Sequence, residues 1–228
     1  MGSDYDRPLD RSFSMTAVRS ADELADRPWK SIPNLYDIKL GIGALVLIWG
    51  PPGAGKSTML LRWLNSMPGP VLYASLEERF SPSFRIKLSQ AGVSRKDFKI
   101  LSCSSASDLV GVIIGQRPRY FAIDSLSGTS IKSGDLRRIQ LNRLDALFGI
   151  LHATKAGLPA GSNDFLHEAD VVVSLESFKY TVDKSRYGDV GKGGQVYAVD
   201  NRCPDKKNSR AEGQLLVLPI GEHRPPAT

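Results

Sequence analysis

The sequence predicts an α/β fold with a mostly parallel central β-sheet, flanking helices and antiparallel hairpins at the C-terminal edge of the sheet. Three observations support this prediction. Between residues 44 and 154, short apolar segments typical of buried strands alternate with segments of helical periodicity. The first apolar segment leads directly into a glycine-rich turn. The later apolar segments have no long helical segment between them, as expected of hairpins.

The elements follow in chain order. Residues 1–30 form a polar segment that we interpret as a flexible arm with one short helix at 20–25. Strands are predicted at 44–49, 71–75, 98–101, 119–125, 146–154, 171–175, 195–199 and 214–218. Helices are predicted from Lys56 onward and at 83–91, 108–116 and 134–145. Residues 31–220 are therefore expected to form one domain, followed by a polar tail at 221–228.

Composition limits the class of protein. The chain has 228 residues, of which 41% are hydrophobic, enough for one domain with a real core. No apolar segment approaches the ~20 residues of a membrane helix, and the N-terminus lacks the apolar centre of a signal peptide. Cys103 and Cys203 are the only cysteines, which indicates reduced thiols in the cytoplasm. The net charge of +6 permits a nucleic-acid partner without demonstrating one.

The glycine-rich turn matches the phosphate-binding P-loop pattern G-x-x-x-x-G-K-[ST]. It comprises Gly50, Pro51, Pro52, Gly53, Ala54, Gly55, Lys56, Ser57 and Thr58. Its glycines let the backbone approach phosphate, and N–H groups at the start of the next helix point at the anion. Lys56 is predicted to contact the β- and γ-phosphates, and Ser57 to bind Mg²⁺. An ordinary turn would not require this lysine–serine pair.

Three further polar side chains lie at or just after the C-terminal ends of predicted strands and are expected at the same edge of the sheet. Asp124 ends an apolar strand and is a candidate ligand of Mg²⁺; an aspartate that caps a core strand is the alternative. Glu77, or its neighbour Glu78, is a candidate to activate a water molecule, unless the pair lies in a solvated turn. His152 is a candidate sensor of the γ-phosphate, and a histidine packed in the core is the alternative.

Residues 178–210 combine basic, aromatic and glycine residues. Tyr180, Tyr187 and a glycine-rich segment at 188–194 are interleaved with Lys179, Lys184, Arg186, Lys192, Arg202, Lys206, Lys207 and Arg210. Cationic and aromatic side chains in a mobile segment are typical of single-stranded nucleic-acid sites. The alternative is a solvated β-hairpin whose lysines protect a sheet edge.

Four segments together resemble the RecA-type ATPases, and among them the ATPase core of bacterial RadA (Sms). GPPGAGKSTMLL at 50–61 resembles the family's Walker A motif, and FAIDS at 121–125 its Walker B motif. VLYASLEE at 71–78 resembles VLYVSGEES. The most discriminating segment is HATKAGLPAGSNDFLHEADVVVSLE at 152–176, which resembles HVTKEG-x-x-AGP-x-x-LEH-x-VD-x-V-x-x-x-E. A weaker match aligns VDNRC at 199–203 with VKNRFG.

The resemblance covers about residues 31–220 and implies a RecA-like fold with ATP and Mg²⁺ as ligands. It implies that Glu77 is the catalytic carboxylate and that Lys155, with the 156–165 loop, faces single-stranded DNA. It also implies that Arg202 contacts the nucleotide of a neighbouring subunit, in a ring or a filament. The expected function is DNA-stimulated ATP hydrolysis in recombination, repair or annealing. A recombinase or a single-strand-binding protein is a candidate partner.

The chain also departs from the family. Neither its four-cysteine zinc finger nor its Lon-like domain is represented in these 228 residues, and Asp200 replaces the lysine of VKNRFG. A core of this size resembles phage RadA-like annealing proteins as well. Two other functions remain as alternatives: a nucleotide-dependent switch that acts on a protein partner, and a DnaB-like helicase motor. A small-molecule kinase is disfavoured, because no lid segment is evident between the Walker motifs.

Overall fold

The computed structural model describes residues 31–102, 106–127, 129–140, 144–160 and 163–197. The chain divides into two compact units, Met1–Val196 and Tyr197–Thr228, and every helix and strand below belongs to the first. The predicted arm, its helix at 20–25, the strand at 214–218 and the tail lie outside the described residues.

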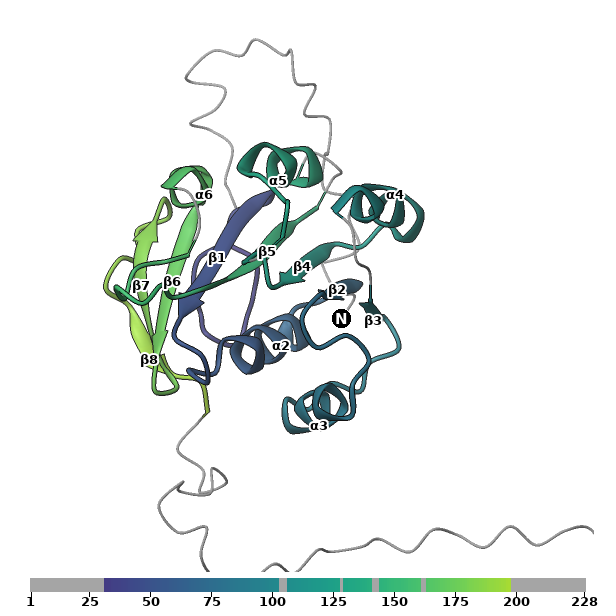
Figure 1. Cartoon of the computed structure of the whole chain (residues 1–228), viewed down its shortest axis with the longest axis horizontal. Helices are drawn as coiled ribbons and strands as arrows, with labels where there is room; N and C mark the ends of the chain where they lie inside the picture. Colours follow the sequence, from purple (N-terminus) through teal and green to yellow (C-terminus); the bar gives the residue numbers. More distant parts are fainter. Residues whose placement is uncertain (1–30, 103–105, 128, 141–143, 161–162, 198–228) are drawn as a thin grey trace, which may run out of the picture. The chain divides into compact units, whose positions relative to one another are not determined.

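Within the described residues, a sheet of eight strands runs in the order β3-β2-β4-β5-β1-β6-β7-β8 (Figure 1). The strands are β1 Ala44–Gly50, β2 Val71–Ser75, β3 Phe98–Leu101, β4 Tyr120–Asp124, β5 Ala146–His152, β6 Val171–Glu176, β7 Lys179–Ser185 and β8 Gly193–Gln195. All pairs from β3 to β6 are parallel, whereas β6–β7 and β7–β8 are antiparallel. The predicted fold class is therefore confirmed.

The strand order decides which loops meet. β5 lies between β1, which leads into the P-loop, and β4, which ends at Asp124. Gly50 at the end of β1 pairs in register with His152 at the end of β5. Asp124 pairs in register with Ser75, the last residue of β2. Because these strands are parallel, the four loops that follow them leave the same edge of the sheet.

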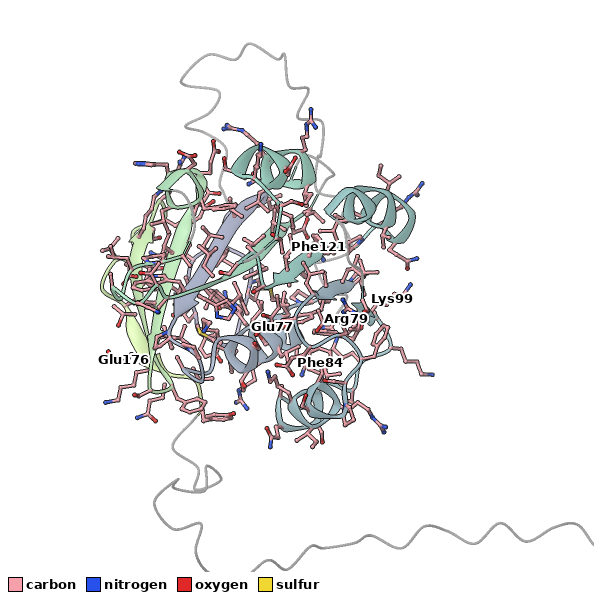
Figure 2. The ribbon with its side chains drawn as sticks, viewed as in Figure 1. Glu77, Arg79, Phe84, Lys99, Phe121 and Glu176 are labelled. Atoms are coloured by element: carbon pink, nitrogen blue, oxygen red, sulfur yellow. The ribbon has the colours of Figure 1, made fainter. Side chains whose placement is uncertain are left out.

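Helices cover both faces of the sheet (Figure 1). One face carries α2 Lys56–Ser66 and α3 Pro82–Gln90, and the other carries α4 Ala106–Gln116, α5 Ser133–Gln140 and α6 Asn163–Glu168. On the first face, the ring of Trp63 in α2 packs on Phe148 of β5 at a centroid distance of 5.4 Å. On the second face, Ile113 and Leu136 pack with Phe121 of β4 (Figure 2). None of the helices in the described part of the chain is long and apolar enough to cross a membrane.

The predicted elements from β1 to β5 and the strand predicted at 171–175, which is β6, are all present, with small shifts at their ends. α3 begins at Pro82, where proline suits a first helical position, and the Ser81 hydroxyl caps it by accepting a hydrogen bond from the Phe84 N–H (3.2 Å). Its Phe84 side chain is buried, and the ring lies 5.7 Å from that of Tyr73 in β2 (Figure 2). The helix predicted at 134–145 ends earlier, at Gln140.

The C-terminal part of the sheet, after β6, differs from the prediction. The strand predicted at 195–199 is wrong in position, because β8 ends at Gln195 and the neighbouring strand is β7. β7 was not predicted, although its buried Tyr180 and Val182 alternate with exposed residues, the signal of a half-buried strand. The short helix α6 was also not predicted.

Candidate functional site

The P-loop joins β1 to α2 and has the backbone that the motif requires. Gly53 and Gly55 both have positive φ angles, of 75° and 96°, and α2 begins at the next residue, Lys56. At Gly50, a Cβ atom would lie 2.2 Å from the carbonyl oxygen of Leu175 in β6, so a larger residue cannot occupy this position. The N–H groups at the start of α2 thus face the loop, as an anion site requires.

The Lys56 side chain is folded into the P-loop. It is buried, and its Nζ atom donates hydrogen bonds to the carbonyl oxygens of Gly50 (2.9 Å) and Pro51 (2.8 Å). Burial lowers the pKa of Lys56, while the negative charges of Asp124 and Glu77 oppose this shift. The two carboxylates therefore favour the ammonium form that a phosphate ligand needs, and phosphate oxygens are stronger acceptors than the two carbonyl groups.

Asp124 is a buried carboxylate held by two hydroxyl groups. The Tyr73 hydroxyl donates a hydrogen bond to Asp124 Oδ2, and Ser57 is also hydrogen-bonded to this carboxyl. Burial raises the pKa of Asp124, and both hydrogen bonds oppose the shift. Burial and the Asp124 charge raise the pKa of Tyr73 well above 10.0, so Tyr73 stays protonated and acts as the donor. The structure thus brings the two predicted metal ligands, Ser57 and Asp124, together.

This pair fits Mg²⁺ by its chemistry. A hydroxyl and a carboxylate are hard oxygen ligands, and Mg²⁺ commonly takes only one or two protein ligands while phosphate and water complete its octahedron. Among the described residues, no group of three or more histidine, cysteine, aspartate or glutamate side chains could hold a metal ion unaided. A site completed by nucleotide phosphates agrees with both observations.

Glu77 and His152 meet at the same edge of the sheet. The N–H groups of Leu76 (2.8 Å) and Glu77 (3.3 Å) donate to the Asp124 carbonyl oxygen, which fixes the segment after β2 against the end of β4. Glu77 Oε2 then lies 3.2 Å from His152 Nε2. The Ser125 hydroxyl lies 3.1 Å from the same ring nitrogen.

The grouping of Ser125, His152 and Glu77 is not a nucleophilic triad. In such a triad, the serine and the acid contact opposite nitrogens of the imidazole, so that the acid fixes the tautomer used by the serine. Here both contacts involve Nε2 of His152. Through that nitrogen the ring can donate to Glu77 or accept from Ser125. His152 at the end of β5 therefore forms a polar link between the segment after β2 and the segment after β4.

Glu77 and Glu78 have different environments. More than half of the Glu77 side chain is exposed, beside His152. Glu78 forms an ion pair with Lys87 of α3. From the sequence, either residue could be the water-activating carboxylate. In the structure Glu77 is the better candidate, because the Glu78 carboxylate is paired with Lys87 of α3.

The predicted DNA-contacting residues do not form one surface in the subunit. Lys155 is exposed in the loop after β5, at the P-loop edge. Lys184 instead donates to the carbonyl oxygens of Leu166 (2.7 Å) and His167 (3.0 Å) near the end of α6. Lys184 and the next predicted residue, Arg186, lie at the far end of β7, since β7 runs antiparallel to β6.

Two of these residues form intramolecular ion pairs. Arg186 Nε lies 3.4 Å from Asp170 Oδ1. Lys192 Nζ lies 2.9 Å from Asp37 Oδ2. For residues 178–197, the described part of this segment, the architecture is that of the alternative interpretation, a β-hairpin with charged residues at a sheet edge. Arg202 lies outside the described residues, and its predicted role stays a prediction.

Two polar residues of the site, Tyr73 and Ser125, were not predicted from the sequence. Tyr73 precedes Ser75 by two residues in β2, so both face the side of the sheet on which Asp124 lies, and this alternation was the available signal. Ser125 carries no signal of its own, because its contact with His152 depends on the pairing of β4 with β5.

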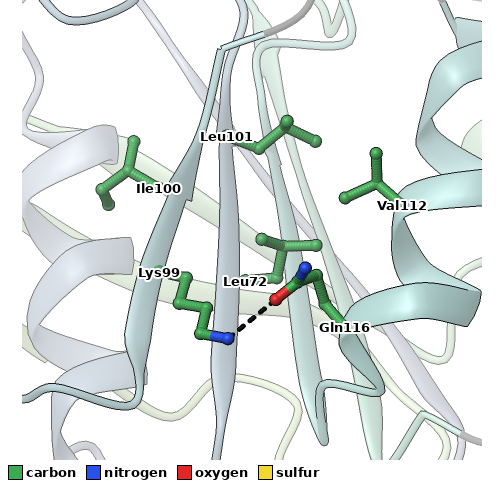
Figure 3. A pocket seen from close by; sticks show the side chains of 6 residues that line it. All are labelled: Leu72, Lys99, Ile100, Leu101, Val112 and Gln116. Atoms are coloured by element: carbon green, nitrogen blue, oxygen red, sulfur yellow. Dashed lines mark hydrogen bonds between the residues drawn. The ribbon is translucent and has the colours of Figure 1, made fainter.

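A shallow pocket lies elsewhere, between β3 and α4 (Figure 3). It measures about 400 Å³ and is lined by Leu72, Lys99, Ile100, Leu101, Val112 and Gln116. A hydrogen bond of 2.7 Å joins Lys99 Nζ to Gln116 Oε1 across it. Three strands, β2, β4 and β5, separate β3 from β1, so this pocket is distinct from the P-loop site.

No protein-family model matches the chain. Among curated proteins it is similar to the DNA repair protein RadA of Treponema pallidum, at 28% identity over 205 residues, covering 79% of this chain and 44% of that protein. RadA of Bacillus subtilis is 27% identical over 156 residues, covering 60% and 34%, and RadA of Pseudomonas aeruginosa is 24% identical over 192 residues, covering 74% and 42%. The chain thus spans less than half the length of these relatives.

Among solved structures, the flagellar accessory protein FlaH of Methanocaldococcus jannaschii superposes with a TM-score of 0.51 and 14% sequence identity. The match covers 68% of this chain and 85% of FlaH, and at this identity it bears on the fold alone. FlaH has the RecA-like fold. The chain therefore has a RecA-like P-loop fold, and its sequence resembles the RadA proteins.

Proposed function

We propose that the chain binds Mg-ATP at its P-loop and hydrolyses it. The observation that carries this proposal is the convergence of four groups from separate strands at one edge of the sheet. The phosphate-binding Lys56 follows β1, Asp124 ends β4, Glu77 follows β2 and His152 ends β5. These are the cation, the metal ligand, the water-activating carboxylate and the polar sensor that ATP hydrolysis uses.

Each residue then has one task. Lys56 and the N–H groups of α2 bind the β- and γ-phosphates, and Ser57 and Asp124 hold Mg²⁺, which supplies positive charge against the phosphate oxygens. Glu77 accepts a proton from the attacking water. His152 Nε2, at 3.2 Å from Glu77, orients that carboxylate. Because general-base catalysis depends on orientation, His152 acts as a positioning residue in this scheme.

We further propose that hydrolysis is coupled to single-stranded DNA, in a homo-oligomer that acts in recombination, repair or annealing. The resemblance to RadA and the net charge of +6 support this step. So does the loop after β5, which carries the exposed Lys155 and is tied to His152, because the Ala160 N–H donates to the His152 carbonyl oxygen (2.6 Å). A displacement of His152 would therefore be transmitted through the backbone to the loop that carries Lys155.

The test is ATP hydrolysis with and without single-stranded DNA, at low and high salt. We expect turnover that DNA stimulates, with a stimulation that fades as salt rises, because phosphate contacts release counterions. Lys56→Ala should abolish turnover under all conditions. Lys155→Ala should weaken DNA binding and reduce its salt dependence by about one unit of slope, whereas Lys155→Arg should retain both. Turnover that depends on Lys56 but is the same with and without DNA would contradict the proposed coupling to DNA, while the proposal of ATP hydrolysis would remain supported.

We infer that Arg186 is a stronger candidate than Arg202 for the contact with the nucleotide of a neighbouring subunit. The segment Lys184-Ser185-Arg186-Tyr187-Gly188 keeps the lysine, arginine, aromatic residue and glycine of VKNRFG at the same spacing. It follows β7 at the edge where the parallel strands begin, opposite the P-loop of its own subunit. The Arg186 N–H donates to the Asp170 carbonyl oxygen (2.9 Å), which fixes its backbone. We propose that Arg186 reaches the nucleotide of a neighbour.

Arg186→Ala should lower kcat by about tenfold, the effect of losing one charge-assisted hydrogen bond, with little change in ATP affinity. Arg202→Ala serves as the matched control and should retain activity. Subunits with Arg186→Ala keep an intact P-loop site, and subunits with Glu77→Gln keep an intact Arg186. Mixed oligomers therefore contain sites that combine an intact Glu77 with the Arg186 of a neighbour, and mixing the two impaired variants should raise turnover above that of either variant alone. A mixture no more active than its components would contradict a contact in trans.

One observation favours a different function, a nucleotide-dependent switch that acts on a protein partner. Three of the predicted DNA contacts, Lys184, Arg186 and Lys192, are engaged with groups of the same subunit. If DNA leaves turnover unchanged at low salt, we favour this function. A protein partner bound in the ATP state and released in the ADP state would then support it.

A further inference from the structure

The turn between β6 and β7 has an unusual composition for its conformation. Glu176 pairs with Lys179, so Ser177 and Phe178 are the two central residues of a tight hairpin turn. Their φ angles are +49° and +61°. Turns with positive φ at both central positions strongly favour Asn-Gly, since side chains are strained there. Backbone preference therefore does not account for a phenylalanine at residue 178.

This turn is docked on the P-loop. The Phe178 N–H donates to the carbonyl oxygen of Ala54 in the P-loop (3.1 Å), and the Phe178 carbonyl oxygen accepts from the Val196 N–H (2.8 Å). The ring lies against Gly55, where a Cβ atom would be only 2.5 Å from Phe178 Cδ1. Any residue other than glycine at position 55 would displace the ring. Phe178 itself is half-buried, so part of its side chain is open to solvent beside the loop.

The position of the ring fits one part of a bound nucleotide. The hydrolytic groups Glu77 and Asp124 belong to β2 and β4, which lie on one side of β1 in the sheet order. The γ-phosphate must face that side. The β6–β7 turn lies on the other side of β1, next to the residue that precedes α2. The remainder of the nucleotide, which leads away from the γ-phosphate, is therefore directed toward Phe178.

We propose that Phe178 is a stacking platform for the base of the nucleotide that the P-loop binds. The inference rests on the proposed function, because it requires a nucleotide at the P-loop. An aromatic face gains stability from stacking on any base, because every base has a π-face. The platform therefore adds affinity for nucleotides over inorganic phosphates and discriminates weakly between adenine and guanine.

The experiment compares Mg-ATP with Mg-tripolyphosphate, which has the phosphates but no base, by titration calorimetry on the full chain. Phe178→Leu keeps an apolar side chain against Gly55 and removes the flat face. We expect Phe178→Leu to weaken ATP binding by about 5- to 100-fold, the range measured for base stacking on aromatic residues, and to leave tripolyphosphate affinity unchanged within about 2-fold. Phe178→Tyr should bind both ligands as the wild type does.

A second variant keeps the test independent of any loss of folding in the first. In Phe178→Trp, we expect ATP to quench a fluorescence component that tripolyphosphate does not, over the wild-type signal from Trp29, Trp49 and Trp63. Equal weakening of both ligands in Phe178→Leu would overturn the platform and show that the turn only shapes the P-loop. Unchanged ATP affinity in Phe178→Leu, or no quenching in Phe178→Trp, would overturn it as well. A wild-type chain that binds neither ligand would instead refute the proposed function.

Discussion

Glu77→Gln is expected to reduce ATP turnover by about 10²- to 10⁴-fold, the contribution typical of a positioned general base. Glutamine keeps the shape of the side chain and a hydrogen bond to His152, but it cannot accept the proton of the attacking water. ATP affinity should stay close to that of the wild type, because the phosphates and metal are held by other residues. Steady-state turnover and nucleotide titration on the same preparation measure both quantities.

The neighbouring carboxylate provides a matched control. Glu78→Gln removes the same charge one residue later, but in the structure this side chain pairs with Lys87 of α3. Its loss should therefore leave kcat within about 2-fold, because a partly exposed ion pair contributes little free energy. An inactive Glu78→Gln beside an active Glu77→Gln would reverse the assignment of the two residues.

Asp124→Asn is expected to weaken Mg²⁺ binding and to lower Mg²⁺-dependent turnover by about 100-fold. This is the upper end of the loss typical for a group that only supports a metal ligand, because here the proposed ligand itself loses its charge. The asparagine oxygen can still accept the hydrogen bond from Tyr73, so the surrounding packing is retained. The measurement is turnover as a function of Mg²⁺ concentration. A Mg²⁺ dependence identical to that of the wild type would contradict the role of Asp124 as a ligand.

The same substitution should stabilise the chain in the absence of ligand. Burial raises the pKa of Asp124 above its ordinary value of 3.8, so the folded state binds the proton more tightly than the unfolded state. Stability from this group is then present below pH 3.8 and is lost as pH rises through the folded pKa. At neutral pH, Asp124→Asn removes this penalty, and Tm should rise by about 2–4 °C, the effect of ~1 kcal/mol in a domain of this size.

The difference in Tm between Asp124→Asn and the wild type should depend on pH. As the pH falls toward 3.8, the wild-type carboxyl takes up its proton, and the Tm difference between the two proteins should shrink. A Tm difference that does not change with pH would show that the gain does not come from the buried charge. Thermal unfolding of both proteins over a series of pH values measures this directly.

The α/β class, the P-loop and the strands from β1 to β6 could all be predicted from the sequence. Each is encoded locally: a buried strand by a run of apolar residues, and the P-loop by glycines, lysine and serine at fixed spacing. The presence of polar residues at Glu77, Asp124 and His152 was also evident, because each lies at or just after the end of an apolar strand. The local pattern could not rank Glu77 against Glu78, since they are adjacent carboxylates in the segment that follows β2.

The tertiary structure decided which of these groups meet. The placement of β5 between β1 and β4 brings His152 between Ser125 and Glu77, and the pairing of β2 with β4 brings Tyr73 to Asp124. It also separates the basic residues of β7 from Lys155 and docks Phe178 on Gly55. These contacts join residues far apart in the chain. They depend on strand order and register, which the pairing of distant strands sets and no local pattern of residues encodes.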